Sequence, residues 1–183
     1  MTDFTKKEIK RSFLKLLEDY PYSEITVKKL IKECAISRSA FYYHFPDLPS
    51  VIDEIVQDEI NELLRRYPTV ESVDQCLDAM MNTILARRRT YLHVYRSVSR
   101  EMLERHLLSS CGKFVSSYVD TAQEENTLSP EEKGLIVQHY KCLLFGFIVD
   151  WLEEGLKPEK AEEYKRILKL NGSSPAEFVR HVK

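Results

Sequence analysis

Residues 36–45 read ISRSAFYYHF, and this stretch decides how the chain is interpreted. Ser37 can cap a helix, because a serine hydroxyl accepts hydrogen bonds from the free amides of a first turn. On that helix Phe41 and Phe45 are four residues apart and share one face. The opposite face carries Arg38, Ser39, Tyr42 and Tyr43. Two outward aromatic rings beside an arginine predict a surface that binds a partner.

The sequence before this stretch predicts two more helices. The first has an apolar face from Ile9 to Tyr20 and ends at Pro21. The second is capped by Thr26 and is joined to the third by the short turn 34–36. One compact core is expected from Phe13, Leu16, Leu17, Leu30, Ile31, Phe41 and Phe45.

The third helix has the dimensions of a DNA-reading element. A helix about 10 to 12 Å across fits the major groove of B-DNA, which is about 12 Å wide. Arg38 can donate two hydrogen bonds to guanine, while tyrosine hydroxyls can contact phosphates and their rings can pack on sugars or thymine methyls. Thr26 and the amides that open the second helix suit another phosphate. Periodicity alone leaves a second interpretation open, an amphipathic helix with chance surface tyrosines.

Residues 5–55 resemble the DNA-binding domain of TetR-type transcriptional regulators, whose helix-turn-helix runs T-V-x-x-I-A-x-x-A-G-V-S-x-G-T-L-Y-x-H-F. Residues 26–45 read TVKKLIKECAISRSAFYYHF, and the R-S-x-F-Y-Y-H-F variant resembles a subgroup from Gram-positive bacteria. The residues that recur at the family's spacing are Thr26, Val27, Ser37, Tyr42, His44 and Phe45. With the helix geometry, the resemblance implies that DNA is contacted by Thr26, Val27, Lys28, Ser37, Arg38, Ser39, Ala40, Tyr42, Tyr43 and His44.

Several positions depart from the family's pattern. Ala35 stands at the usual glycine of the turn and Tyr20-Pro21 at the glycine that often ends the first helix, so we expect altered local geometry but the same fold. Ser39 and Ala40 replace Gly-Thr, and Leu48 stands where a phosphate-binding lysine is usual. The backbone contacts are therefore expected to be weaker, or to come from Lys6, Lys28 and Lys29.

Composition places the chain among soluble globular proteins, with 43% hydrophobic and 31% charged residues in 183. Its longest apolar run, residues 142–149, is far shorter than the roughly 20 residues that cross a bilayer. The start MTDFTKKEIK has no apolar segment typical of a secretory signal. We therefore expect a cytoplasmic protein with no membrane partner.

Charge and cysteines refine this description. Residues 1–45 hold nine Lys or Arg against six Asp or Glu, giving +3, whereas the remaining residues hold 18 against 23, giving −5. This distribution indicates a small basic module on an acidic body. Four cysteines are expected to be reduced and buried by helical periodicity, with no metal site: Cys34, Cys76, Cys111 and Cys142.

The remaining chain also predicts helices. Asp47 can cap a helix to about Tyr67, and amphipathic stripes cover residues 73–85 and 103–119. Ser-Pro-x-Glu start signals stand at 129–132 and 174–177. The predicted fold is all-α, with an N-terminal three-helix DNA-binding domain at residues 1–47 and a larger helical ligand-binding and dimerisation domain at 48–183.

Two expectations concern this larger domain. The segment 145–155, FGFIVDWLEEG, resembles the late helix that pairs with its copy in TetR-type homodimers, which implies an interface of Phe145, Ile148, Trp151 and Leu152. The alternative is a helix fully buried within a monomer. Polar groups for a mostly apolar ligand pocket are His93, Tyr95, His106, Tyr118, His139 and Tyr140, and each can equally be a satisfied core residue.

The main functional hypothesis is a dimeric repressor that leaves a palindromic double-stranded DNA operator when it binds a small, mostly apolar organic molecule. An enzyme or carrier is the second hypothesis. It is disfavoured because the sequence has no Gly-rich phosphate loop, H-E-x-x-H, G-x-S-x-G or nucleophile with its base, and no cofactor is expected. The third is an activator, or a regulator controlled by another protein, without a small ligand.

Overall fold

The computed structural model describes residues 2–68, 73–97, 100–122 and 128–170. In these residues the chain is helical and has no strand. The elements are α1 Thr2–Asp19, the 3-10 helix η1 Tyr22–Glu24, α2 Val27–Glu33, α3 Arg38–His44, α4 Leu48–Arg66, α5 Val73–Ala86, α6 Arg88–Ser97, α7 Arg100–Ala122, α8 Pro130–Glu153 and α9 Pro158–Leu170. The predicted all-α class is confirmed.

The local start signals form as the sequence predicts. Ser129 accepts a hydrogen bond from the Glu132 amide, and the Glu132 carboxylate accepts one from the Ser129 amide, which completes a capping box at α8. Asp47 Oδ1 accepts from the Ser50 amide at 2.9 Å at the start of α4. The predicted signal at 174–177 lies outside the described residues.

Contacts divide the chain into two compact units. The first unit combines residues 1–59 with 87–103, and the second combines residues 60–86 with 104–183. The division therefore falls inside α4 and inside α7. The boundary expected at residue 47 coincides with the start of α4 and stays a prediction.

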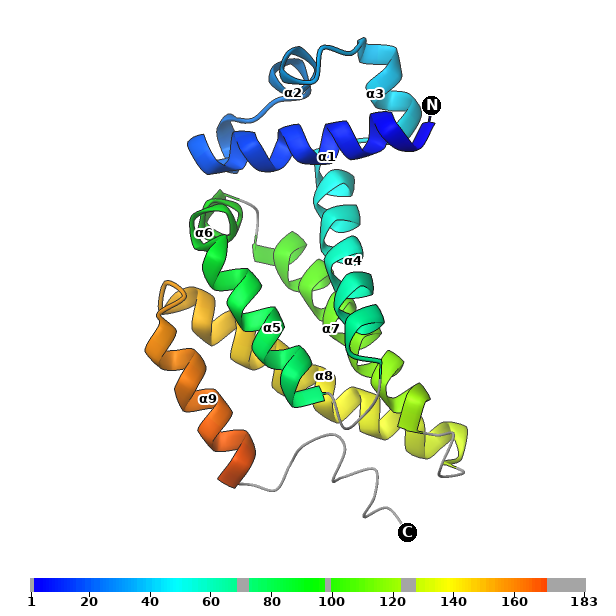
Figure 1. The fold of residues 1–183 in the computed structure, drawn as a ribbon, viewed down its shortest axis with the longest axis vertical. Helices are drawn as coiled ribbons and strands as arrows, with labels where there is room; N and C mark the ends of the chain where they lie inside the picture. Colours follow the sequence, from blue (N-terminus) through cyan, green and yellow to red (C-terminus); the bar gives the residue numbers. More distant parts are fainter. Residues whose placement is uncertain (1, 69–72, 98–99, 123–127, 171–183) are drawn as a thin grey trace. The chain divides into compact units, whose positions relative to one another are not determined.

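The first unit is built around α1. Helices α2 and α3 lie on one side of α1 in Figure 1, and α6 packs against α1 as well. The predicted residues of this core are confirmed, with Ile31 partly buried at its edge. Fully or nearly fully buried are Ile9, Phe13, Leu16, Leu17, Ile25, Leu30, Cys34, Phe41, Phe45, Leu48, Val51 and Ile55. This core fixes the positions of the two helices of the helix-turn-helix.

The second unit contains α5, α8, α9 and most of α7. Its largest buried side chain is Trp151, which is fully buried and donates from Nε1 to the Lys157 carbonyl at 2.7 Å. After α8 the chain reverses through Gly155 (φ 76°) and Leu156 (φ 56°), whose amides bond to the carbonyls of Leu152 and Trp151. This hydrogen-bond pair is a Schellman motif, and it ends α8 within the unit's own core.

One cysteine prediction is wrong. Cys34, Cys76 and Cys111 are free and buried as expected, and burial raises the pKa of the Cys111 thiol to about 12. Cys142 is free but exposed, because the apolar residues of α8 surround the helix and periodicity could not show which side the protein covers. Among the described helices, α8 is also the one long and apolar enough to cross a membrane. Core helices of soluble proteins pass the same test, so this is weak evidence for a membrane span.

Candidate nucleic-acid interface

Helix α2 has a cap at each end. Thr26 is extended at the N-cap, and its hydroxyl accepts from the Lys29 amide at 3.1 Å. At the other end the amides of Ala35 and Ile36 bond to the carbonyls of Lys32 and Ile31, at 3.3 and 3.1 Å. This is again a Schellman motif, which requires a left-handed residue after the C-cap.

Ala35 supplies that left-handed residue, with φ 54°. A side chain with a Cβ is strained in this conformation, whereas glycine is not. The alanine at the family's glycine position is thus accommodated by backbone strain in a fully formed turn. The turn leads directly to the extended N-cap Ser37, whose hydroxyl accepts from the Ala40 amide at 3.1 Å.

Helix α3 is oriented as the opening stretch predicts. Phe41 and Phe45 are 0% and 2% exposed and belong to the core of the first unit. Tyr42 is 45% exposed and Tyr43 75% exposed, and Arg38 and Ser39 are also exposed. The outward direction of these four side chains is therefore confirmed. Such exposed rings would bury apolar surface against a bound partner.

The outward side chains interact with one another. Arg38 Nη2 donates to the Tyr42 hydroxyl at 3.3 Å, and the guanidinium carbon lies 5.4 Å from the centre of the Tyr42 ring. The hydroxyls of Ser37 and Ser39 are 2.9 Å apart. The rings of Tyr43 and the half-buried His44 meet edge to face. The outer face of α3 thus carries hydrogen-bond donors and aromatic rings that contact one another.

The other predicted contact residues surround this group. Lys28 and Thr26 are exposed, Ala40 is partly exposed, and Val27 packs partly against the core. Two of the three lysines proposed as replacements are engaged within the protein: Lys6 pairs with Glu54 at 2.7 Å, and Lys29 Nζ lies 3.0 Å from the centre of the Tyr20 ring. Leu48 is 9% exposed and completes the core, so it cannot replace the phosphate-binding lysine that is usual at this position of the family.

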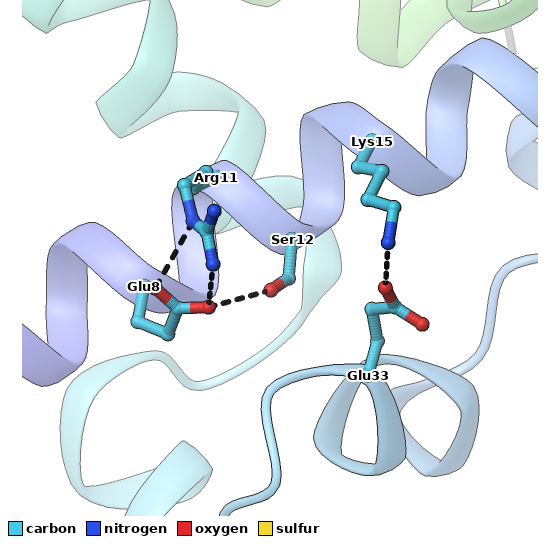
Figure 2. A network of polar contacts seen from close by, with 5 residues as sticks. All are labelled: Glu8, Arg11, Ser12, Lys15 and Glu33. Atoms are coloured by element: carbon cyan, nitrogen blue, oxygen red, sulfur yellow. Dashed lines mark hydrogen bonds and ion pairs between the residues drawn. The ribbon is translucent and has the colours of Figure 1, made fainter.

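A polar network links α1 to α2 (Figure 2). Arg11 donates to both carboxylate oxygens of Glu8 at 3.1 and 2.7 Å, and the buried Ser12 hydroxyl donates to Glu8 at 3.2 Å. The hydrogen bond from Arg11 holds the pKa of Glu8 below its usual value. Lys15 of α1 pairs with Glu33 of α2 at 2.7 Å. No sequence pattern predicts this last pair, because its members are 18 residues apart.

Helix α6 is a second feature absent from the sequence prediction. His93 Nδ1 lies 2.7 Å from the Leu17 carbonyl of α1, and the Tyr91 hydroxyl donates to Glu59 at 2.6 Å. Burial raises the pKa of the Tyr91 phenol well above its usual value. Arg87 also pairs with Glu59. These contacts attach α6 to α1 and α4 of the first unit.

The six pocket candidates are therefore divided between the two units. His93 and Tyr95 lie in α6 with the first unit. In the second unit His139 is exposed and His106 is partly buried. Tyr118 and Tyr140 are buried, and the Tyr118 hydroxyl donates to the Tyr67 carbonyl at 2.6 Å. His106, Tyr118, His139 and Tyr140 thus share one unit, and the ligand pocket stays a prediction.

The four interface candidates lie mainly on the inner side of α8. Ile148, Trp151 and Leu152 are 9%, 0% and 8% exposed within one protomer, and Phe145 is partly buried. Trp151 stacks on Phe147, which in turn stacks on Tyr164 of α9. Among the side chains that the structure describes in the two helices, the exposed large apolar ones are Leu135, Leu143 and Ile167.

Comparison with known proteins agrees with this geometry. Residues 14–48 match the family model described as bacterial regulatory proteins, tetR family, and residues 71–171 match the one described as transcriptional regulator C-terminal region, which alone covers more than half of the chain. The chain is 24% identical over 162 residues to YxbF, an HTH-type transcriptional regulator of Bacillus subtilis (strain 168). That alignment covers 84% of this chain but 41% of YxbF, so the chain spans about two fifths of this relative's length.

A solved structure shows the same fold. The dihydroxyacetone kinase operon activator DhaS superposes with a TM-score of 0.66 at 18% identity, over 91% of this chain and 93% of DhaS. The two family matches cover both the helix-turn-helix and the C-terminal region. The chain belongs to the TetR family of bacterial transcriptional regulators, a family of DNA-binding proteins rather than of enzymes.

Proposed function

We propose that the chain is a cytoplasmic, sequence-specific regulator that inserts α3 into the major groove of double-stranded DNA. The observation that carries this proposal is the outward group Arg38, Tyr42 and Tyr43, held on a helix whose opposite face is anchored by Phe41 and Phe45. The inner phenylalanines fix the helix, so the outer side chains meet DNA in one orientation. Pre-organised contacts of this kind cost less entropy on binding.

The roles follow from side-chain chemistry. Arg38 reads a base edge, with guanine as the best match for a bidentate guanidinium. Tyr43 and Lys28 contact the sugar-phosphate backbone, and the group is completed by Thr26, Val27, Ser37, Ser39, Ala40, Tyr42 and His44. Because Lys6 and Lys29 already have partners within the protein, we expect a modest number of phosphate contacts. The salt dependence of binding should therefore be correspondingly shallow.

We infer that the functional form is a homodimer that binds a palindromic site. The outer side of α8 supports this inference, because Leu135 is 65% and Leu143 44% exposed, and Cys142 is exposed between them. Gly146, also exposed, has open space where a Cβ would stand. Helix α9 adds Ile167, which is 50% exposed. A second copy is the occupant that gives two DNA-reading heads with two-fold symmetry.

The expected interface residues act indirectly in this arrangement. Trp151, Ile148 and Leu152 support α8 from inside the protomer, and the outer residues make the contact between copies. Leu143→Asp should therefore shift the protein from dimer to monomer, whereas Glu153→Asp, at another exposed position of α8, should leave the dimer intact. Sedimentation at micromolar concentration measures this. A monomeric wild-type protein of about 21.5 kDa would contradict the homodimer.

For the effect on transcription we propose repression relieved by a small, mostly apolar organic ligand. Buried Tyr118 and Tyr140 in the second unit support a pocket with few polar groups. Such a ligand acts only if it binds the DNA-free form more tightly than the DNA-bound form. Activation is the second candidate, and the similarity of fold to the operon activator DhaS favours it.

The experiment that tests the function is selection from a library of random DNA duplexes with the full chain. An enriched palindrome with half-site centres about 34 Å apart or a multiple of it is the expected result. Placing that sequence upstream of a reporter in cells that express the protein then distinguishes repression from activation. Failure to enrich any sequence would contradict sequence-specific binding.

A further inference from the structure

Arg38 and Tyr42 stand one helical turn apart on the exposed face of α3. Residues four apart on a helix are neighbours, and here the guanidinium reaches the phenol oxygen as well as the ring. A guanidinium within about 6 Å of a ring centre is attracted by the negative face of the ring. Tyr42 therefore restricts Arg38, an otherwise long and mobile side chain, to a small set of rotamers.

The Tyr42 ring is itself fixed to the protein core. It meets the ring of Phe41 edge to face, with centres 5.3 Å apart and planes at 84°. Phe41 is fully buried, and it also lies beside the buried Phe45 at 6.2 Å between ring centres. Packing thus holds Tyr42 from the inside, and Tyr42 holds Arg38 from the outside.

The hydrogen-bond direction leaves both groups able to bind DNA. A phenol has one donor and two acceptor sites, and Arg38 donates to an acceptor site of Tyr42. The phenol proton is then free for a phosphate oxygen, and accepting a bond from a cation makes the phenol a stronger donor. Arg38 has used one of its five N–H groups, so a pair of parallel N–H groups remains for a base edge.

We propose that Tyr42 is a positioning residue for base readout, which sets the guanidinium of Arg38 while its own hydroxyl donates to the DNA backbone. This inference rests on the proposed function and adds to it a coupling between one phosphate contact and one base contact. A shift of the phosphate would move the arginine with it. Arg38 would then discriminate more strongly between base pairs at the position it contacts than an arginine without this support.

The test is a double-mutant cycle of wild type, Arg38→Ala, Tyr42→Phe and the double variant, on the DNA sequence selected by wild type and on its single-base-pair variants. Tyr42→Phe keeps the ring and its packing on Phe41, and removes only the hydroxyl. Tyr43→Phe is the matched control, because it also removes one exposed phenol hydroxyl. The ring of Tyr43 contacts His44 instead of Arg38. Thermal melting of each variant confirms that it is folded.

We expect Arg38→Ala to remove the preference at one base pair of each half-site, and Tyr42→Phe to weaken that same preference about fivefold or more. The loss of affinity caused by Tyr42→Phe should be at least about fivefold smaller in the Arg38→Ala background than in wild type. The loss caused by Tyr43→Phe should be the same in both backgrounds. Additive losses, or a Tyr42→Phe loss that is equal at every base pair, would overturn the positioning role while leaving DNA binding intact. If wild type enriches no sequence, the proposed function itself fails.

Discussion

The left-handed Ala35 makes a quantitative prediction about stability. Replacing it with glycine removes the strain at φ 54°, which costs a residue with a Cβ about 1 to 2 kcal/mol. Glycine also makes the unfolded chain more flexible, which offsets about 0.4 to 1 kcal/mol of that gain. Ala35 is exposed, so losing its methyl group removes little buried surface. We expect the free energy of unfolding to rise by about 0.5 to 1 kcal/mol.

The assay is urea unfolding of wild type and Ala35→Gly, with thermal melting beside it. For a chain of this length Tm should rise by about 1 to 4 °C. Ala40→Gly is the matched control, because the same chemical change inside α3 should lower the free energy of unfolding by about 0.5 to 1 kcal/mol. Ala35→Gly should also bind the selected DNA as wild type does. If Ala35→Gly is no more stable than wild type, the strain argument for this turn is wrong.

Three further changes test the packing of the chain. Tyr118→Phe should lower the free energy of unfolding by about 1 to 3 kcal/mol in urea titrations, because the Tyr67 carbonyl loses its donor; no loss would argue against that hydrogen bond. Ser129→Ala should cost about 1 kcal/mol at neutral pH by loss of the α8 cap. Hydrogen bonds from Ser129 lower the pKa of Glu132, so the stabilisation from this carboxylate is present at neutral pH and should shrink as pH falls through the lowered pKa. Glu33→Gln breaks the ion pair with the largely exposed Lys15, so its effect on Tm should be small. The effect should vanish in about 1 M salt, where charges at the surface are almost completely screened. An effect that does not depend on salt would indicate that Glu33 contributes by packing instead.

The DNA-binding unit could be predicted from sequence because its information is local. Ser37 and Asp47 are capping residues at the starts of helices, and Phe41 and Phe45 repeat at the helical period. Each of these signals lies within a few residues of the structure it specifies. The confirmed core and the outward direction of Arg38 and Tyr43 followed from that spacing.

Other features depend on contacts between distant residues and were missed for that reason. Helix α6 is joined to α1 by His93 and the Leu17 carbonyl, 76 residues apart, so His93 could not be placed from its neighbours. On α8, apolar residues occur all around the helix, and periodicity could not separate the inner Trp151 from the outer Leu143 or Cys142. Which side of a uniformly apolar helix is covered is decided by the fold of the rest of the unit.

The central claim is that the outer face of α3 reads DNA, and the most direct test is the affinity of Arg38→Ala for the selected duplex. Arg65→Ala is the control, because it removes the same charge from an exposed position of α4. One good bidentate base contact is worth about 1 to 3 kcal/mol, so Arg38→Ala should bind about 5- to 150-fold more weakly, with unchanged Tm. Arg65→Ala should bind as wild type does, apart from a small uniform effect of net charge. Equal affinities for wild type and Arg38→Ala would contradict the assignment of α3 as the reading helix.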